Sequence, residues 1–141
     1  MKKVMSYALM LPALACMLFA CSEVKTDVKD LDGKWNIMVV KGEKVLEEGL
    51  PQMEFNIPDQ KIHGNTGCNI FNSSVVLDPS DVSAITIAPA ATTMMACPNM
   101  DEERQILDAM DGVTGVKAGP EAGQMSLVDD SGNVLLVLSK N

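Results

Sequence analysis

Gln52-Met53-Glu54-Phe55-Asn56-Ile57 is the stretch that decides the fold, because polar and apolar side chains alternate along it without a break. Such a period of two places one row of side chains on a core and the other in solvent, which indicates a half-buried β-strand. Pro58-Asp59 then forms a turn, and residues 61–65 return as the hairpin partner. The middle of the chain is therefore predicted to be antiparallel β-structure.

Further short strands are predicted on both sides of this hairpin, each rich in β-branched or aliphatic residues. Their ranges are 35–40, 70–77, 84–88, 124–128 and 134–138, with an extended stretch over 92–98. The single helix begins after Asn99, which precedes Glu102 as in a capping box, and ends at Gly112. This order predicts a mainly β (α+β) fold, a small antiparallel β-barrel with one helix packed against it.

The first twenty residues have the parts of a secretory signal, with Lys2 and Lys3 before an apolar run over 7–19. That run is shorter than the roughly 20 residues a membrane-spanning helix needs, so it indicates a targeting segment. Leu18-Phe19-Ala20-Cys21 resembles a lipobox, where a bacterial lipoprotein precursor is cut before a cysteine that is then diacylated. An ordinary secretory cut after Ala20 is the alternative.

The lipobox divides the chain into a lipoprotein signal peptide (1–20), a lipidated N-terminus with a flexible tether (21–30) and one domain (31–141). Lipidation of Cys21 predicts a protein of the cell envelope, attached to the membrane through its lipid. Ser22 stands where an aspartate would resemble an inner-membrane retention signal. We therefore expect the outer membrane, on its periplasmic or surface face.

The net charge of the mature chain limits the classes of molecule that it can bind. Lys2 and Lys3 leave with the signal, so 9 of the 11 basic residues remain against 19 acidic ones, a net charge of −10. Phosphate backbones repel such a chain, which argues against nucleic-acid binding. The roughly 110 remaining residues suffice for one domain, and we expect a monomer.

Two of the four cysteines remain for the domain, since Cys16 leaves with the signal and Cys21 carries lipid. In an oxidising envelope compartment, Cys68 and Cys97 are expected to form a disulfide. Closing a loop of about 30 residues would stabilise the fold by roughly 3–4 kcal/mol. Two buried free thiols are one alternative, and a reactive Cys68 thiol near His63 is another.

The segment Gly64-Asn65-Thr66-Gly67-Cys68-Asn69 is the candidate binding loop, with Gly64, Asn65, Gly67 and Asn69 as its site residues. Glycines there would let a ligand approach the backbone. The alternative is a tight turn that needs positive φ, with Asn69 hydrogen-bonding locally. The lysine–serine or lysine–threonine pair of a phosphate-binding loop does not follow.

No other residues form a convincing reactive site. His63 is interpreted as a solvent-facing strand residue, and the acidic residues 101–103 as partners of the helix dipole. Met94 and Met95 are expected to pack in the core. We expect no catalytic residue, no metal and no cofactor.

The motifs resemble those of a known family. They are Leu31-x-Gly33-x-Trp35, Phe55, Gly64-x-x-Gly67-Cys68-Asn69-x-Phe71, Thr93-Met94-Met95-Ala96-Cys97 and Glu103. In this order, over residues 30–139, they resemble the META domain, also called the HslJ family. The resemblance implies a small barrel-like fold with one helix, envelope residence and an association with stress tolerance, including resistance to a hydrophobic antibiotic. No enzymatic activity or cofactor is established for the family. Members often carry arginine or lysine where Thr93-Met94 stands here.

These features predict a lipid-anchored, non-catalytic envelope protein with a binding or structural role in stress tolerance. Its expected partners are the membrane, through the lipid, and an unknown envelope protein or small hydrophobic ligand. An alternative function is inhibition of a basic host enzyme such as lysozyme, which the acidic charge would attract. Binding of small hydrophobic compounds is another.

Overall fold

A computed structural model describes residues 25–45 and 49–141 of the chain, so the predicted signal peptide and Cys21 lie outside the described residues. The helical elements are η1 (Val28–Leu31) and α1 (Met100–Asp111). The strands are β1 (Gly33–Val40), β2 (Glu43–Lys44), β3 (Gln52–Asn56), β4 (Lys61–Asn65), β5 (Ile70–Leu77), β6 (Ile85–Ile87), β7 (Ala91–Thr92), β8 (Gly115–Ala118), β9 (Gln124–Val128) and β10 (Val134–Lys140).

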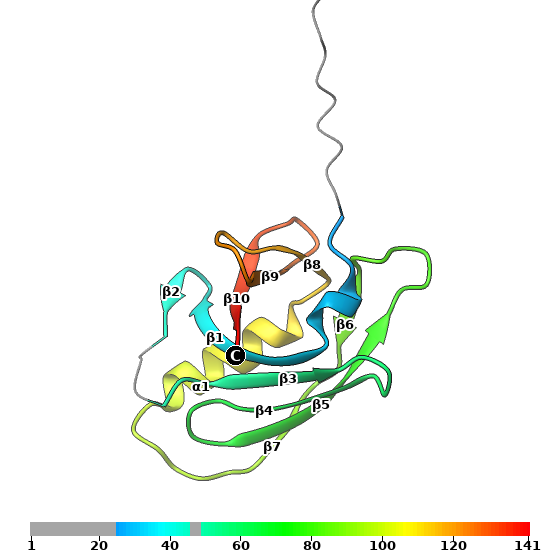
Figure 1. Cartoon of the computed structure of the whole chain (residues 1–141). Coiled ribbons are helices and arrows are strands. Elements are labelled where there is room, and N and C mark those ends of the chain that lie inside the picture. The colour runs from blue at the N-terminus through cyan, green and yellow to red at the C-terminus, as the bar shows by residue number, and fades with distance from the viewer. Residues whose placement is uncertain (1–24, 46–48) are drawn as a thin grey trace, which may run out of the picture.

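The strands form one antiparallel sheet in the order β6-β5-β4-β3-β1-β10-β9-β8, with β2 added to β1 and β7 to β5 (Figure 1). The two ends of this order meet, because Ile85 N donates to Thr114 O (3.1 Å) and Val116 N donates to Ser83 O (2.9 Å). The expected nearly closed β-barrel is thus confirmed. Closure protects the outermost strand edges, which would otherwise be free to pair with other chains.

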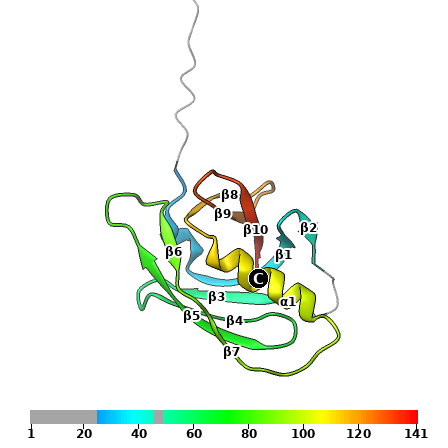
Figure 2. The same ribbon diagram turned by 180° about the vertical axis from the view of Figure 1, so that it is seen from behind.

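Alternating side chains of the strands point into one apolar core, as the period of two requires. Met53 and Phe55 of β3, at 0% and 1% exposure, are part of that core. Figure 2 shows α1 running between the β8–β10 strands and the β3–β5 strands. The helix buries Ile106, Ala109 and Met110 there, which confirms the predicted helix packed against the barrel.

Two local predictions fail at the ends of elements. Asn99 precedes α1, but its side chain makes no capping hydrogen bond, so the capping-box interpretation is wrong. Strand β8 was not expected from residues 115–118, a short stretch that lacks an alternating pattern. It forms because both of its edges find partners, β9 on one side and a bridge from Ala84 to Gly115 on the other.

The packed domain begins before residue 31, the predicted domain boundary. Val28 and Leu31 of η1 are buried, and Val28 N donates to Val82 O (2.7 Å). Lys25 forms an ion pair with Asp81 (3.1 Å). The hydroxyl and backbone N–H of Ser83, together with Lys25, lower the pKa of Asp81 to about 2. Residues 28–30, assigned to the tether, are therefore part of the folded domain.

Five of the methionines are either buried in the core or exposed on the surface. Met53, Met110 and Met125 fill the core, with exposures of 0%, 1% and 7%. Met94 and Met95 instead lie on the surface, at 96% and 56% exposure. The expectation that these two pack in the core is wrong, because the hydrogen bonds of their segment hold it outside the barrel.

Candidate functional site

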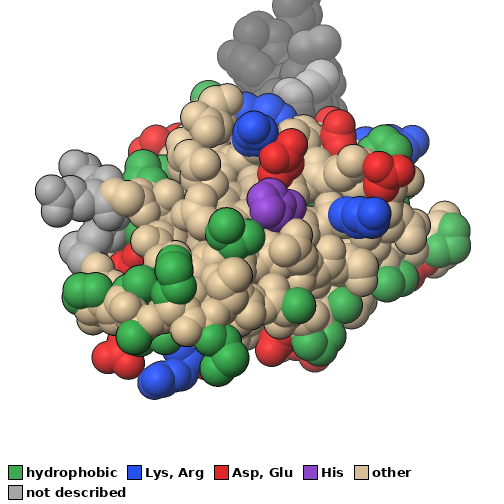
Figure 3. All heavy atoms as spheres, turned by 90° about the horizontal axis from the view of Figure 1, so that it is seen from below, with side chains coloured by type: hydrophobic (Ala, Val, Ile, Leu, Met, Phe, Trp, Pro, Cys, Tyr) green, Lys and Arg blue, Asp and Glu red, His purple; other side chains and the backbone are tan. Residues whose placement is uncertain are grey.

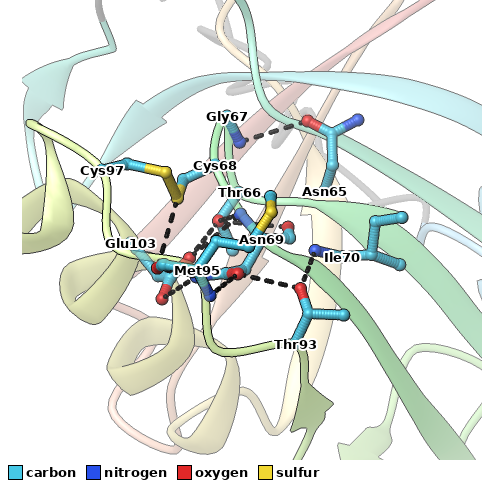
Figure 4. Close-up of a disulfide and its surroundings, with 10 residues drawn as sticks. All are labelled: Asn65, Thr66, Gly67, Cys68, Asn69, Ile70, Thr93, Met95, Cys97 and Glu103. Carbon is cyan, nitrogen blue, oxygen red and sulfur yellow. Dashed lines mark hydrogen bonds between the residues drawn. A yellow bond between two sulfur atoms is a disulfide. The ribbon is translucent and has the colours of Figure 1, made fainter.

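The candidate loop is fixed by a disulfide. Cys68, between β4 and β5, is bonded to Cys97, which precedes α1, with their Cα atoms 6.0 Å apart (Figure 4). The two cysteines are 29 residues apart in the sequence. The expected bond is present, so neither free thiols nor a reactive Cys68 remain as alternatives in this structure.

Asn69 lies at the centre of a polar network beneath this disulfide, and its side chain is fully buried. Its Oδ1 accepts hydrogen bonds from Thr93 Oγ1 (2.8 Å) and Met95 N (2.7 Å). Its Nδ2 donates to Met95 O (3.1 Å) and Glu103 Oε1 (3.0 Å). A single amide thus holds the segment before α1 and the helix itself against the loop. Its bonds reach beyond the local turn that the sequence suggested.

Glu103 is a motif residue whose role in the network the sequence interpretation missed. It is 6% exposed, and its Oε2 accepts from Thr66 Oγ1 (2.5 Å) and from Asn69 N (3.3 Å). Explaining this carboxylate by the helix dipole alone was wrong. A signal was available, because Glu103 precedes Ile106 by three positions and Met110 by seven, which places it on the buried face of the helix.

The two glycines of the loop are needed for different reasons. Gly67 has φ +89°, a left-handed conformation that favours glycine. Gly64 does not have positive φ. It lies in β4 with no space for a side chain, since a Cβ there would stand 2.6 Å from Phe71 Cζ and would also overlap Gln52 O. The turn interpretation is therefore right for Gly67 and wrong for Gly64.

Replacing Gly64 by alanine should lower the free energy of unfolding by about 2 kcal/mol, because overpacking in a filled core displaces the Phe71 ring and the β3 backbone. Urea unfolding followed by tryptophan fluorescence measures this loss. Gly112→Ala is the matched control, since Gly112 is right-handed (φ −89°) and the neighbour of its Cβ at 3.1 Å is the end of the Leu135 side chain. Equal losses in both variants would contradict the steric explanation.

Two of the four predicted loop residues, Asn65 and Gly67, reach the surface, whereas Gly64 is buried. Gly64 and Asn65 line a pocket of about 220 Å³ on the outer face of β1, β3 and β4. Asn65 and Gly67 line an adjoining hollow of about 560 Å³. Asn69 lies beneath, buried in the network. The loop therefore presents Asn65 to solvent, while Asn69 fixes its backbone.

His63 lies on the same outer face and is exposed, as predicted. Its Nδ1 is 2.9 Å from Asn72 Oδ1, and Cys68, the partner considered for a catalytic pair, is bonded to Cys97. Within residues 25–45 and 49–141, no group of three His, Cys, Asp or Glu side chains is placed to hold a metal ion. None of the helices in this part of the chain is both long and apolar enough to cross a membrane.

Fold and site define a small antiparallel β-barrel that carries one helix and a disulfide-fixed loop. The META domain model matches residues 27–141, which is most of the chain. The chain belongs to the META-domain family, as its motifs indicated.

Solved structures share the fold at low sequence identity. A protein from Burkholderia xenovorans solved by NMR has a TM-score of 0.60 and 18% identity, covering 100% of this chain and 99% of that one. A DUF4847 family protein from Bacteroides vulgatus has a TM-score of 0.55 and 11% identity, covering 79% and 94%. Another NMR structure has a TM-score of 0.55 and 20% identity, covering 77% and 89%. Among curated proteins, none matches this chain.

Proposed function

We propose that this chain is a lipid-anchored protein of the cell envelope, attached through Cys21, with a non-catalytic binding role in envelope stress tolerance. The observation that carries the proposal is the Cys68–Cys97 disulfide. Such bonds form and persist in oxidising compartments such as the bacterial periplasm. The lipobox-like residues Leu18-Phe19-Ala20-Cys21 supply the route to that compartment.

A binding role fits the chemistry of the exposed loop better than catalysis. The sulfur of Cys68 is consumed in the disulfide, and the imidazole of His63 faces an amide oxygen of Asn72 without a nucleophile. The buried loop side chains Thr66 and Asn69 hold the loop backbone in place through hydrogen bonds to Glu103 of α1. A rigid, disulfide-closed loop is suited to presenting a surface.

Small hydrophobic compounds are a second candidate ligand, favoured by one groove. It holds about 490 Å³ on the outer face of β8–β10 and is lined largely by apolar residues, among them Val39, Pro120, Val134 and Val137. If this groove binds apolar molecules, Nile red should fluoresce more strongly with the protein, and Val134→Lys should remove the increase. An equal increase with Val134→Lys would rule out the groove. The lysozyme-inhibitor alternative has only the acidic net charge in its favour.

Cys21→Ser tests the proposed function most simply. Without the thiol there is no acceptor for the lipid, so the protein should move from the membrane fraction to the soluble periplasmic fraction. Cells that carry only this variant should be as sensitive to envelope stress as cells without the protein. Cys16→Ser, within the predicted signal, is the matched control and should leave membrane attachment unchanged. A Cys21→Ser protein that stayed in the membrane fraction would overturn the lipid anchor.

A further inference from the structure

Two rows of polar side chains cross the outer face of the sheet where the candidate loop reaches the surface. In the register of the sheet, Lys34 of β1 is opposite Glu54 of β3, Glu54 is opposite His63 of β4, and His63 is opposite Asn72 of β5. The histidine stands in the middle of this face, among charged neighbours, in Figure 3.

The second row runs beside the first and consists mainly of amides. In it, Asn36 is opposite Gln52, Gln52 is opposite Asn65, and Asn65 is opposite Ile70. Gln52 and Asn65 line both the 220 Å³ pocket and the 560 Å³ hollow, so the two adjoin. We call this surface, lined by Asn36, Gln52, Asn65 and Ile70, the amide groove.

The amide groove has unused hydrogen-bonding capacity of both kinds. Gln52 Nε2 donates to Asn36 Oδ1 (3.1 Å), and Gly67 N donates to Asn65 Oδ1 (3.1 Å). Among the residues that the structure describes, the amide nitrogens of Asn36 and Asn65 donate to no partner, and Gln52 Oε1 accepts from none. Each side-chain amide has two N–H donors and a carbonyl acceptor. The free N–H groups of Asn36 and Asn65 therefore flank the free carbonyl oxygen of Gln52 in the groove.

The charge of the groove differs from that of the whole chain. The charged side chains that border it, Lys34 and Glu54, form an ion pair (3.9 Å), whereas the full chain carries −8. An anionic ligand would be repelled by the overall field. The alternating donors and acceptors match an uncharged ligand rich in hydroxyl and amide groups. Half-exposed Ile70 (48%) offers a small apolar wall beside them.

We infer that the amide groove binds a neutral oligosaccharide that carries acetamido groups. Side-chain amides pair reciprocally with an acetamido N–H and C=O, and sugar hydroxyls use the remaining donors and acceptors. Ile70 contacts the acetamido methyl group. The inference rests on the proposed function, because it assigns the ligand class of the envelope binding role, and glycans of this kind are met in an envelope.

The test is a titration of the full mature protein, ¹⁵N-labelled and purified in detergent micelles, with chitotetraose as the probe. The side-chain amide signals of Asn36, Gln52 and Asn65 should shift most in TROSY spectra. Gln52→Ala should weaken binding about tenfold, because it removes the shared acceptor of the groove. Gln105→Ala, an exposed amide on α1, is the matched control and should bind as the natural protein does.

Cellotetraose has the same linkage and length but lacks acetamido groups, and should bind several-fold more weakly. Binding of cellotetraose equal to that of chitotetraose would overturn the acetamido assignment. The whole inference would be overturned by an absence of shifts at millimolar probe, by shifts confined to the other sheet face, or by stronger binding of trialanine. Failure here leaves the lipid anchor intact, whereas failure of the Cys21→Ser experiment would leave this titration unaffected.

Discussion

Asn69→Ala should lower the free energy of unfolding by about 3 kcal/mol, since it removes one buried amide and leaves its buried and partly buried hydrogen-bond partners unpaired. Those partners are Thr93 Oγ1, Met95 N, Met95 O and Glu103 Oε1. The buried carboxylate is the costliest to leave without a donor. Urea unfolding, extrapolated to water, measures the loss.

Asn72→Ala is the control for this variant. Asn72 is also an asparagine on the β4–β5 hairpin, but it is exposed and its side chain bonds only to His63 among the described residues. Its replacement should change stability by less than about 0.5 kcal/mol. A loss below about 1 kcal/mol for Asn69→Ala would contradict the role of the network in holding the loop.

Replacing both Cys68 and Cys97 by serine should cost about 3–4 kcal/mol. The disulfide closes a loop whose ends are 29 residues apart, and opening it restores chain entropy to the unfolded state. Urea unfolding of the double variant measures the cost. Reduction of the natural protein with dithiothreitol should give a similar shift of the midpoint.

The double serine variant should itself be insensitive to dithiothreitol, which serves as the control for the reductant. If the natural protein unfolded at the same urea concentration with and without dithiothreitol, the disulfide would contribute nothing to stability.

Much of the fold followed from local patterns in the sequence. The alternation at 52–57 and the predicted range 61–65 correspond to β3 and β4, because a half-buried strand carries its period of two in the sequence itself. The predicted ranges 70–77 and 124–128 correspond to β5 and β9. Strand β8 could not be predicted this way. It depends on closure of the barrel, where Ala84 meets Gly115, and that contact is visible only in three dimensions.

The sequence predicted which residues form the candidate site, but it did not predict how they are arranged in space. The sequence singled out Gly64, Asn65, Gly67 and Asn69 as one loop, yet the structure separates surface-lining Asn65 from buried Asn69. The row from Asn36 to Ile70 joins four strands by register, and no spacing along the chain encodes that register. Met94 and Met95 were misassigned because an apolar side chain alone does not reveal whether its backbone is held outside the core.

The mass of the mature protein, released from its own envelope without reducing agent, is the measurement that decides the proposed function. The proposal predicts a chain that begins at Cys21, is heavier by a diacylglyceryl group and a fatty acyl chain, and lacks two hydrogens through the Cys68–Cys97 bond. A chain with the same start but no lipid, or with both thiols intact, would contradict a lipid-anchored protein stabilised for an oxidising compartment.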